Sequence, residues 1–402
     1  MLGKWLYYGI LEDLHSEFFV EETFSQNWGD SVNVKFEENY WEDKYVFNDK
    51  KVPAFLQQIG YKIFLTGKYV NVIKVYDPKR ELQKTLNLID NYTYTLYSDE
   101  LKECVEKAFD WANRQLVSIV MEEAKLIPRL QSIKRFYFME QGDYFLHFMD
   151  LAEEELRKNV KNISLEKLQN FLDLSIRIAS TNSDPYKEDL SCNLTLYSTL
   201  EVLQAFQHYN TLKDNKKIEF ENQLSYANLY GNKKGFECFN LDYSVKWPLN
   251  LVLSKSTLLR YQILFRYLFV LKYSERQLYA TWQTFQEQRD LNNNRFFRLS
   301  SSLLQRMLHL SKTIIYHFLI EVVQKRWDEL IHKLTHSVDT FEDILAHHDA
   351  FLQGCFREGL LFEKKFKSLI WNQNAFFNFY CDNMRDFLVN YLNYDYKSLI
   401  VS

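Results

Sequence analysis

Hydrophobic positions in this chain recur at helical spacing, most clearly between Ser132 and Lys158. Two helical stretches there are separated by Gln141-Gly142, and Asp143 stands where its carboxylate can cap the second stretch. The apolar residues of that second stretch fall on one helical face: Phe145, Phe148, Met149, Ala152 and Leu156. The pattern therefore predicts an amphipathic helix that packs its apolar face on a core.

The opposite face of this helix is charged. Glu153 precedes Arg157 by four residues and Glu154 precedes Lys158 by four, and this acid-first order favours ion pairs along a helix. The run Glu153-Glu154-Glu155 could suggest paired carboxylates for acid–base chemistry, but consecutive helical positions point in different directions. A solvated charged face is the simpler interpretation.

The same spacing predicts helices along most of the chain. Their approximate ranges are Leu2–Ile10, Ile59–Gly67, Asp99–Pro128, Ser164–Arg177, Thr195–Leu212, Ser256–Phe285, Leu299–His336, Asp339–Cys355 and Asn374–Leu392. Ser164 is placed to cap its helix, and Asp339 with Glu342 forms a start that is similar to a capping box. The helix from Ser256 is apolar nearly all round, which is typical of a helix in the middle of a bundle.

Gly67-Lys68 raises the alternative of a phosphate-binding loop. The upstream glycine at the required spacing is missing, and no Ser or Thr follows Lys68. Gly67 is therefore expected to end its helix, and the chain is not expected to bind GTP itself.

One short segment has the period of a strand. Apolar and polar residues alternate from Phe239 to Trp247, and Pro248 then interrupts the pattern. The polar stretch Asp214–Gly235 before it is predicted to be a mobile loop. The expected fold class is all-α, an elongated stack of helical bundles with at most a short extended segment near residues 236–248.

Composition adds limits rather than a function. In 402 residues, 47% are hydrophobic and 25% charged, which is typical of a folded globular chain. The 32 Phe and 27 Tyr favour thick helix–helix interfaces, because each aromatic ring buries a large area. A net charge of −4 gives no support to a nucleic-acid partner. The five cysteines form no CxxC pair, and no apolar run is long enough for membrane insertion.

Candidate catalytic groups are few. The run His347-His348-Asp349 is of a kind that binds metal in some all-helical phosphohydrolases, with His309, His332 or His336 as possible further ligands. His348, however, falls on the apolar stripe of its predicted helix, which favours a hydrogen-bonded core histidine. Cys355 lies on the same stripe and is interpreted as a structural thiol rather than a nucleophile.

A resemblance to a known family extends over most of the chain and is strongest at residues 132–160, 236–269 and 303–308. Residues 132–156, SIKRFYFMEQGDYFLHFMDLAEEEL, resemble the segment SIKRxFxMxQGDFFxHFMDLAEEEL of gamma-tubulin complex components, most closely of the component-two type. Residues 239–269 resemble that family's FDYxVKWPLSLI…RYQxLFRxLF, and residues 303–308 resemble its LRQRML. The helix from Asp339 resembles its DDVLxHHxxFLxxCLxxxLL segment. The resemblance is weak at residues 75–100, 214–235 and 363–402.

The resemblance implies two grip regions. Residues 1–160 would be part of the first region, which assembles laterally with a component-three-like subunit, and the helices that usually precede it would be missing. Residues 161–402 would be the second region, which binds gamma-tubulin. The residues expected at that interface are Phe239, Asp242, Tyr243, Lys246, Trp247, Lys255, Arg260, Tyr261 and Arg266. For the apolar members of this set, core packing is the open alternative.

The implied function is a non-enzymatic scaffold that carries gamma-tubulin and templates microtubule nucleation. No cofactor or metal is expected. The implied location is the cytoplasm and cytoskeleton, at a microtubule-organising centre such as a centrosome, basal body or spindle pole. The alternatives are a helical-rod subunit of a vesicle-tethering complex and, more distantly, a metal-dependent phosphohydrolase.

Overall fold

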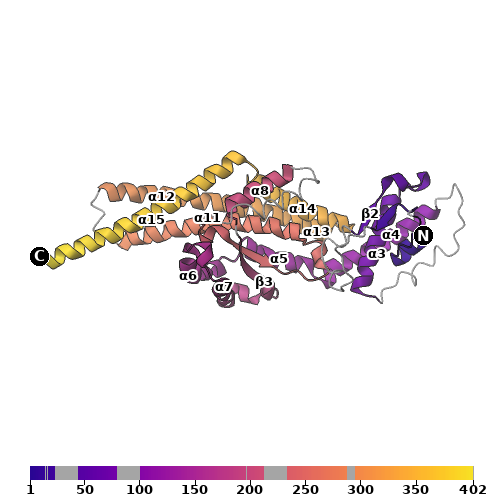
Figure 1. Cartoon of the computed structure of the whole chain (residues 1–402), viewed down its shortest axis with the longest axis horizontal. Coiled ribbons are helices and arrows are strands. Elements are labelled where there is room, and N and C mark those ends of the chain that lie inside the picture. The colour runs from indigo at the N-terminus through magenta and orange to yellow at the C-terminus, as the bar shows by residue number, and fades with distance from the viewer. Residues whose placement is uncertain are drawn as a thin grey trace. The chain divides into compact units, whose positions relative to one another are not determined.

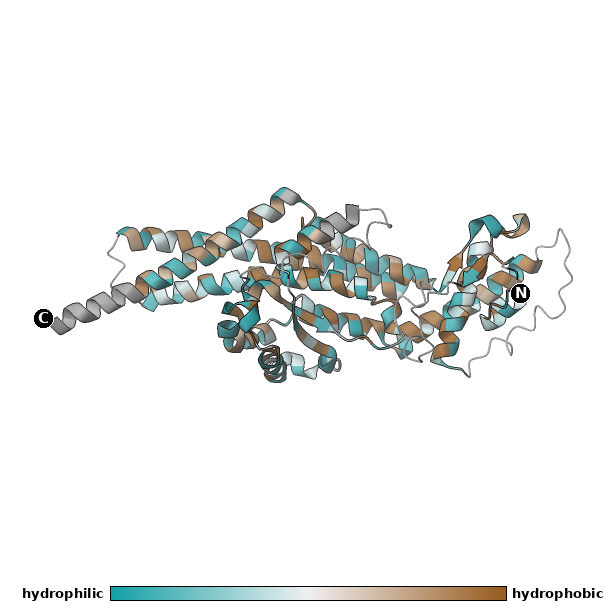
Figure 2. Ribbon diagram, in the orientation of Figure 1, coloured by the Kyte–Doolittle hydropathy of each residue, from teal (hydrophilic) through white to brown (hydrophobic). Residues whose placement is uncertain are grey.

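The computed structural model describes residues 1–13, 15, 17–22, 44–78, 100–195, 197–211, 233–287 and 295–401. Most of the stretch predicted to be a mobile loop, Asp214–Gly235, lies outside these residues. The described part is mainly helical, as predicted, and contains two small two-stranded sheets (Figure 1). Apolar and polar residues are interspersed along its helices, as expected of amphipathic packing (Figure 2).

The chain divides into two compact units. Unit 1 comprises Met1–Leu130, Val245–Thr257 and Lys333–His347, and unit 2 comprises Gln131–Ser244, Leu258–His332 and His348–Ser402. Neither unit is continuous in sequence, so several helices begin in one unit and end in the other. The predicted boundary near residue 160 stays a prediction.

Unit 1 is built around packed helices and one short sheet. Its elements are α1 (Leu2–Tyr8), β1 (Val20–Glu22), β2 (Tyr45–Phe47), 3₁₀ turns at Asp49–Lys51, Ala54–Leu56 and Leu249–Leu251, α3 (Gly60–Tyr76), α4 (Glu100–Ser118) and a π-helical turn at Ile119–Glu123. α3 packs on α1 and α4, and β1 pairs antiparallel with β2. Trp5 is fully buried, and its indole N–H donates to the carbonyl oxygen of Ile63 at 2.9 Å.

Gly67 does not end a helix, so that prediction is wrong. It lies in the interior of α3, which continues to Tyr76. A Cβ atom at this position would lie 2.0 Å from Cε2 of Trp5. The glycine is therefore explained by the close approach of the Trp5 ring, which leaves no room for a side chain.

The start of α14 (Phe341–Glu358) is displaced by one residue from the predicted capping box. The Thr340 N–H donates to the Asp343 carboxylate at 2.8 Å, and the Asp343 N–H donates to the Thr340 hydroxyl at 3.2 Å. This reciprocal pair, rather than Asp339 with Glu342, satisfies the free amides at the helix start. Hydrogen bonding to Thr340 accordingly lowers the pKa of Asp343.

Unit 2 contains most of the remaining helices. These are the larger part of α5 (Leu126–Tyr137), α6 (Asp143–Arg157), α7 (Leu165–Ile178), α8 (Thr199–Thr211), α10 (Gly235–Cys238), α11 (Lys255–Glu287), α12 (Arg295–Tyr316), α13 (Lys325–His336) and α15 (Lys364–Val401), with a π-helical segment at His317–Gln324 between α12 and α13. Three short 3₁₀ turns lie at Val160–Asn162, Ser180–Ser183 and Lys187–Asp189. The predicted long helix from Ser256 corresponds closely to α11.

The second sheet joins β3 (Leu190–Leu194) to β4 (Phe239–Tyr243). The two strands are antiparallel, with Leu190 opposite Tyr243 and Leu194 opposite Phe239. β4 confirms part of the predicted extended segment. β3 was not predicted, because its alternation is limited to buried Leu190 and Cys192.

Aromatic rings join the two motif-rich stretches in one inner core. Phe145 of α6 meets Phe269 of α11 edge-on at 5.8 Å between ring centroids, and Phe148 stacks on Phe239 at 5.1 Å. The predicted apolar face of α6 is buried throughout, which confirms that prediction. A fragment that began at residue 161 would lack α6, so this core would be left open to solvent.

An outer bundle of α11, α12 and α15 continues unit 2 beyond the inner core. The three helices lie side by side in Figure 1. Their shared core consists of Leu278, Phe285, Phe297, Leu304, Met307, Phe377, Cys381, Met384 and Leu388. The Tyr380 hydroxyl also donates to the Ser300 carbonyl oxygen at 2.9 Å, which ties α15 to α12.

Candidate functional site

Several of the residues predicted at the partner interface lie inside unit 2. Phe239, Tyr243, Tyr261 and Arg266 are at most 3% exposed. Arg266 donates to the backbone carbonyl oxygens of Tyr197 and Glu237, and burial lowers its pKa to about 10. These side chains hold the core of unit 2 and do not reach its surface.

The other predicted residues are accessible. Asp242, Lys246 and Lys255 are exposed, while Trp247 and Arg260 are half-buried. Asp242 and Arg260 belong to unit 2, whereas the other three belong to unit 1. The accessible members of the predicted set are thus divided between the two units.

The His347-His348-Asp349 run is divided between packing and ion pairing. His348 is buried, and its Nε2 lies 2.8 Å from the Tyr261 hydroxyl. Burial lowers the pKa of His348 to about 4, so the ring is neutral near pH 7. Asp349 forms an ion pair with Arg260. This confirms the interpretation of His348 as a hydrogen-bonded core residue.

The other candidate chemistries were a Cys355 nucleophile and a metal site. Cys355 is fully buried, and burial raises its pKa to about 12, as expected of a structural thiol. Across the residues that the structure describes, no three His, Cys, Asp or Glu side chains are grouped as a metal ion would require. No described helix is long and apolar enough to cross a membrane.

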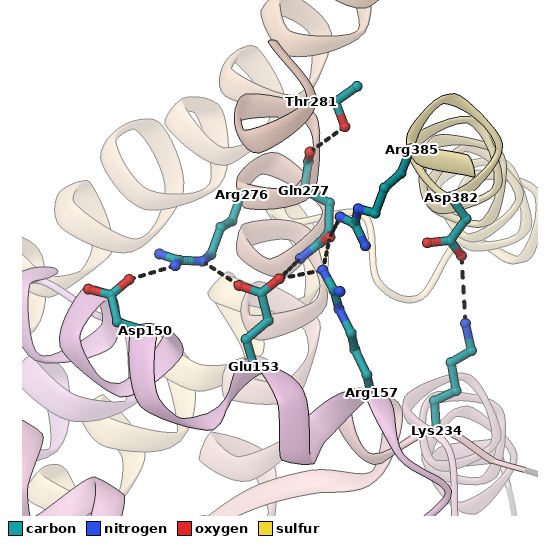
Figure 3. Close-up of polar contacts among 9 residues, drawn as sticks. All are labelled: Asp150, Glu153, Arg157, Lys234, Arg276, Gln277, Thr281, Asp382 and Arg385. Atoms are coloured by element: carbon teal, nitrogen blue, oxygen red, sulfur yellow. Dashed lines mark hydrogen bonds and ion pairs between the residues drawn. The ribbon is translucent and has the colours of Figure 1, made fainter. Parts of the chain in front are cut away.

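The charged face of α6 forms a network with α11 (Figure 3). Glu153 pairs with Arg157, as predicted, and also with Arg276, whose Nε lies 3.2 Å from Glu153 Oε2. Arg276 reaches on to Asp150, at 2.6 Å. Although partial burial opposes it, hydrogen bonding to Gln277 and the two arginines lowers the pKa of Glu153. Glu153 is thus a bridge between helices rather than a solvated charge.

Two local predictions for α6 need correction. Lys158 pairs with Glu155, at 2.5 Å, and not with Glu154, because the helix ends at Arg157 and the chain turns there. Asp143 is the first helical residue rather than the cap. Its carboxylate accepts from the Tyr144 N–H at 2.9 Å and from the Ser180 N–H at 2.6 Å, so it joins α6 to the turn after α7.

An exposed apolar surface on α12 and α15 was missed by the sequence reasoning. We call it the outer face. Its residues, each at least 40% exposed, are Phe296, Leu299, Leu303 and Leu310 on α12 and Leu369, Phe376, Phe379 and Phe387 on α15. The two stripes meet where Phe296 and Phe387 lie 5.7 Å apart between ring centroids. Exposed large apolar side chains gathered on neighbouring helices are a feature of protein contact sites.

The charge around the outer face has one sign along α12. Arg295–Tyr316 contains no Asp or Glu, and its exposed Arg295, Arg298, Arg306 and Lys312 are all basic. In a chain with a net charge of −4, the exposed charges of α12 are therefore all basic, and we call these four residues the basic strip. The surface suits a partner that is apolar at the centre of the contact and acidic around it.

The comparisons with known proteins cover both parts of the chain. Residues 1–123 match the gamma tubulin complex component N-terminal family, and residues 126–393 match the C-terminal family. The chain therefore belongs to the gamma tubulin complex component family.

Within this family the similarity points to one type. The chain is 35% identical over 364 residues to gamma-tubulin complex component 2 of Mus musculus, covering 90% of this chain and 39% of that protein. It is 36% identical to gamma-tubulin complex component 2 of Arabidopsis thaliana, with 90% and 51% covered. Spindle pole body component alp4 of Schizosaccharomyces pombe is 28% identical, with 94% and 54% covered. The chain thus spans about half, or less, of the length of these relatives.

Proposed function

We propose that this chain is a non-enzymatic scaffold of the gamma-tubulin complex, which binds gamma-tubulin and helps to template microtubule nucleation. Family membership over residues 1–123 and 126–393 is the observation that carries the proposal. The names of its relatives, gamma-tubulin complex component 2 and a spindle pole body component, favour a place at a microtubule-organising centre in the cytoskeleton.

The outer face of unit 2 is the proposed docking surface for gamma-tubulin. Exposed aromatic rings with basic residues on the neighbouring α12 have the character of a protein interface, because large apolar side chains dominate the energy of such contacts. Of the residues that the sequence singled out, Asp242, Lys246, Trp247, Lys255 and Arg260 remain candidate contacts. The buried Phe239, Tyr243, Tyr261 and Arg266 support the fold instead.

The test measures binding of purified gamma-tubulin to the full chain by light scattering after size exclusion. We expect a complex with the unmodified chain and at least a tenfold weaker one with Phe376→Gln/Phe379→Gln, because each lost hot spot costs about 2 kcal/mol. Leu146→Gln is the matched control, since Leu146 is also exposed but lies on α6. No complex with the folded chain would contradict the proposed function and favour the vesicle-tethering alternative.

A second comparison decides between the two candidate surfaces. Lys246→Glu/Lys255→Glu reverses exposed charges in the stretch that the resemblance indicated. We expect this variant to bind gamma-tubulin within about threefold of the unmodified chain, as rim charges change affinity little. If it abolished binding while the Phe376→Gln/Phe379→Gln variant did not, the docking surface would be that of the sequence prediction.

Lateral assembly with a component-three-like subunit is the proposed role of the first part of the chain, near residues 1–160. Similarity to gamma-tubulin complex component 3 of Arabidopsis thaliana, 23% identical over 388 residues, supports a common architecture for such neighbours. Co-purification of the two chains tests this. A chain that binds gamma-tubulin but not the component-three-like subunit would contradict lateral assembly alone.

A further inference from the structure

α15 carries three kinds of surface between Leu369 and Leu388. One face packs into the outer bundle through Phe377, Cys381, Met384 and Leu388. A second face is exposed and apolar and forms part of the outer face. The third is polar and carries Asp382, which pairs with Lys234 just before α10, and Arg385, which donates to Gln277 of α11 (Figure 3). The apolar core holds one face of α15, and the polar contacts add further points that hold its rotation and its position along its axis.

Two arginines and one glutamate form hydrogen bonds with Gln277 of α11, which is 4% exposed. Its amide oxygen accepts from Arg157 Nη2 at 2.9 Å and from Arg385 Nη2 at 3.0 Å. Its amide nitrogen donates to Glu153 Oε1 at 3.0 Å. One buried amide therefore joins α6, α11 and α15, as Figure 3 shows.

The arrangement of charge explains why a neutral residue occupies this position. Arg157 and Arg385 both donate to the amide oxygen of Gln277, so their positive charges lie close together. The amide nitrogen of Gln277 links them to the carboxylate of Glu153. An amide can serve both arginines and Glu153 at once, because it accepts and donates through different atoms. A carboxylate at 277 would repel Glu153, and an apolar residue would leave three charged groups without this partner.

We propose that Gln277 and Arg385 are positioning residues for partner binding, which hold α15 in the rotation that presents Phe376, Phe379 and Phe387. We call Glu153, Arg157, Gln277 and Arg385 the α15 latch. The proposal rests on the outer face being the docking surface, as given under the proposed function. The latch does not touch the partner, and it acts by keeping the rings of α15 in register with those of α12.

The test uses the full chain and two readouts, amide hydrogen exchange without partner and affinity for purified gamma-tubulin. Arg385→Met and Gln277→Leu should each accelerate exchange of the Phe376–Leu388 amides about tenfold, the effect of losing a hydrogen bond to a charged group. Affinity should fall about fivefold in both variants, because fewer chains hold α15 in the binding position. Arg385→Lys should restore much of both, since its ammonium group can still donate to Gln277.

Arg276→Met is the matched control. It removes the same charge from the same network and cuts the contacts to Asp150 and Glu153, but it leaves the Gln277–Arg385 hydrogen bond that reaches α15 in place. Faster exchange confined to α15 in the two latch variants, and absent from the control, supports the proposal. Acceleration spread over α13 and α14 would show general loosening and overturn it, as would unchanged exchange.

The two proposals fail in distinguishable ways. Altered α15 exchange with unchanged gamma-tubulin affinity would overturn the positioning role while leaving the proposed function intact. If the unmodified chain did not bind gamma-tubulin, the proposed function would fail, and the hold on α15 would be judged by exchange alone.

Discussion

The inner core and the outer bundle of unit 2 both pack aromatic side chains on α11, but the helices that cover them differ in how apolar their exposed faces are. In the inner core, α6 buries Phe145 and Phe148 and carries charge on much of its other surface. In the outer bundle, α15 buries Phe377 but leaves Phe376 and Phe379 half or more exposed. The inner core is buried by the described elements, whereas the outer bundle has an apolar surface that is exposed among the residues that the structure describes.

The comparison implies that one type of residue has opposite effects in the two regions. Phe148→Ala in the inner core should lower the free energy of unfolding by about 3–5 kcal/mol, because it opens a cavity where the ring stacks on Phe239. Chemical denaturation monitored by circular dichroism measures this. Phe379→Ala, with a ring that is 64% exposed, is the control and should change stability by less than about 0.5 kcal/mol.

Acid should weaken unit 2 through His348. Its folded pKa of about 4 lies below the unfolded value of roughly 6.5, so the unfolded chain binds this proton first as the pH falls. Stability is therefore retained above pH 6.5 and lost between about pH 6.5 and 4, by about 1.4 kcal/mol for each pH unit. Denaturation at a series of pH values measures this slope. His348→Gln should flatten it, and an unchanged slope in that variant would assign the effect to other groups.

The Leu299→Gln variant tests whether α12 contributes to the interface at the outer face. Leu299 is 63% exposed, and Leu and Gln have similar helix propensities, so stability should stay within about 0.5 kcal/mol. Affinity for gamma-tubulin should fall by about 1–2 kcal/mol if α12 and α15 contribute to one interface. Isothermal calorimetry with both proteins pure provides the measurement. Full affinity in this variant would confine the contact to α15.

The smallest expected effect concerns the basic strip on α12. Arg306→Gln/Lys312→Gln should slow association with gamma-tubulin about threefold at low salt and leave dissociation nearly unchanged, because exposed charges act mainly on encounter. Stopped-flow kinetics at two salt concentrations separates the rates. If the variant associated faster than the unmodified chain, the partner surface would be basic rather than acidic.

The helices were predictable because apolar spacing reports directly on which residues face a core. The central stretch shows this best, since every residue on its predicted apolar face is buried. The spacing of apolar residues does not report close approaches between elements. The prediction from spacing therefore ended a helix wrongly at Gly67 and did not include β3. Gly67 is explained only by the Trp5 ring, which arrives from another helix.

The candidate site was harder to predict than the fold. α12 has a buried stripe with Phe297 and Leu304 and an exposed stripe with Phe296 and Leu303, and the two look alike in sequence. Only packing against α11 and α15 decides which stripe is core. The family resemblance instead indicated residues such as Tyr261 and Arg266, because they belong to recognisable motifs. The fold buries both side chains.

The pairing of α6 with α11 also sets the order in which the chain can mature during synthesis. The Phe145 and Phe148 rings have to wait for Phe239 and Phe269, roughly 90 to 125 residues later, before they are covered. At about 5–20 residues per second, an emerging chain would carry the bare apolar face of α6 for roughly 5–25 seconds. A ribosome-bound chain of this protein is therefore expected to need chaperone protection until α11 has left the exit tunnel.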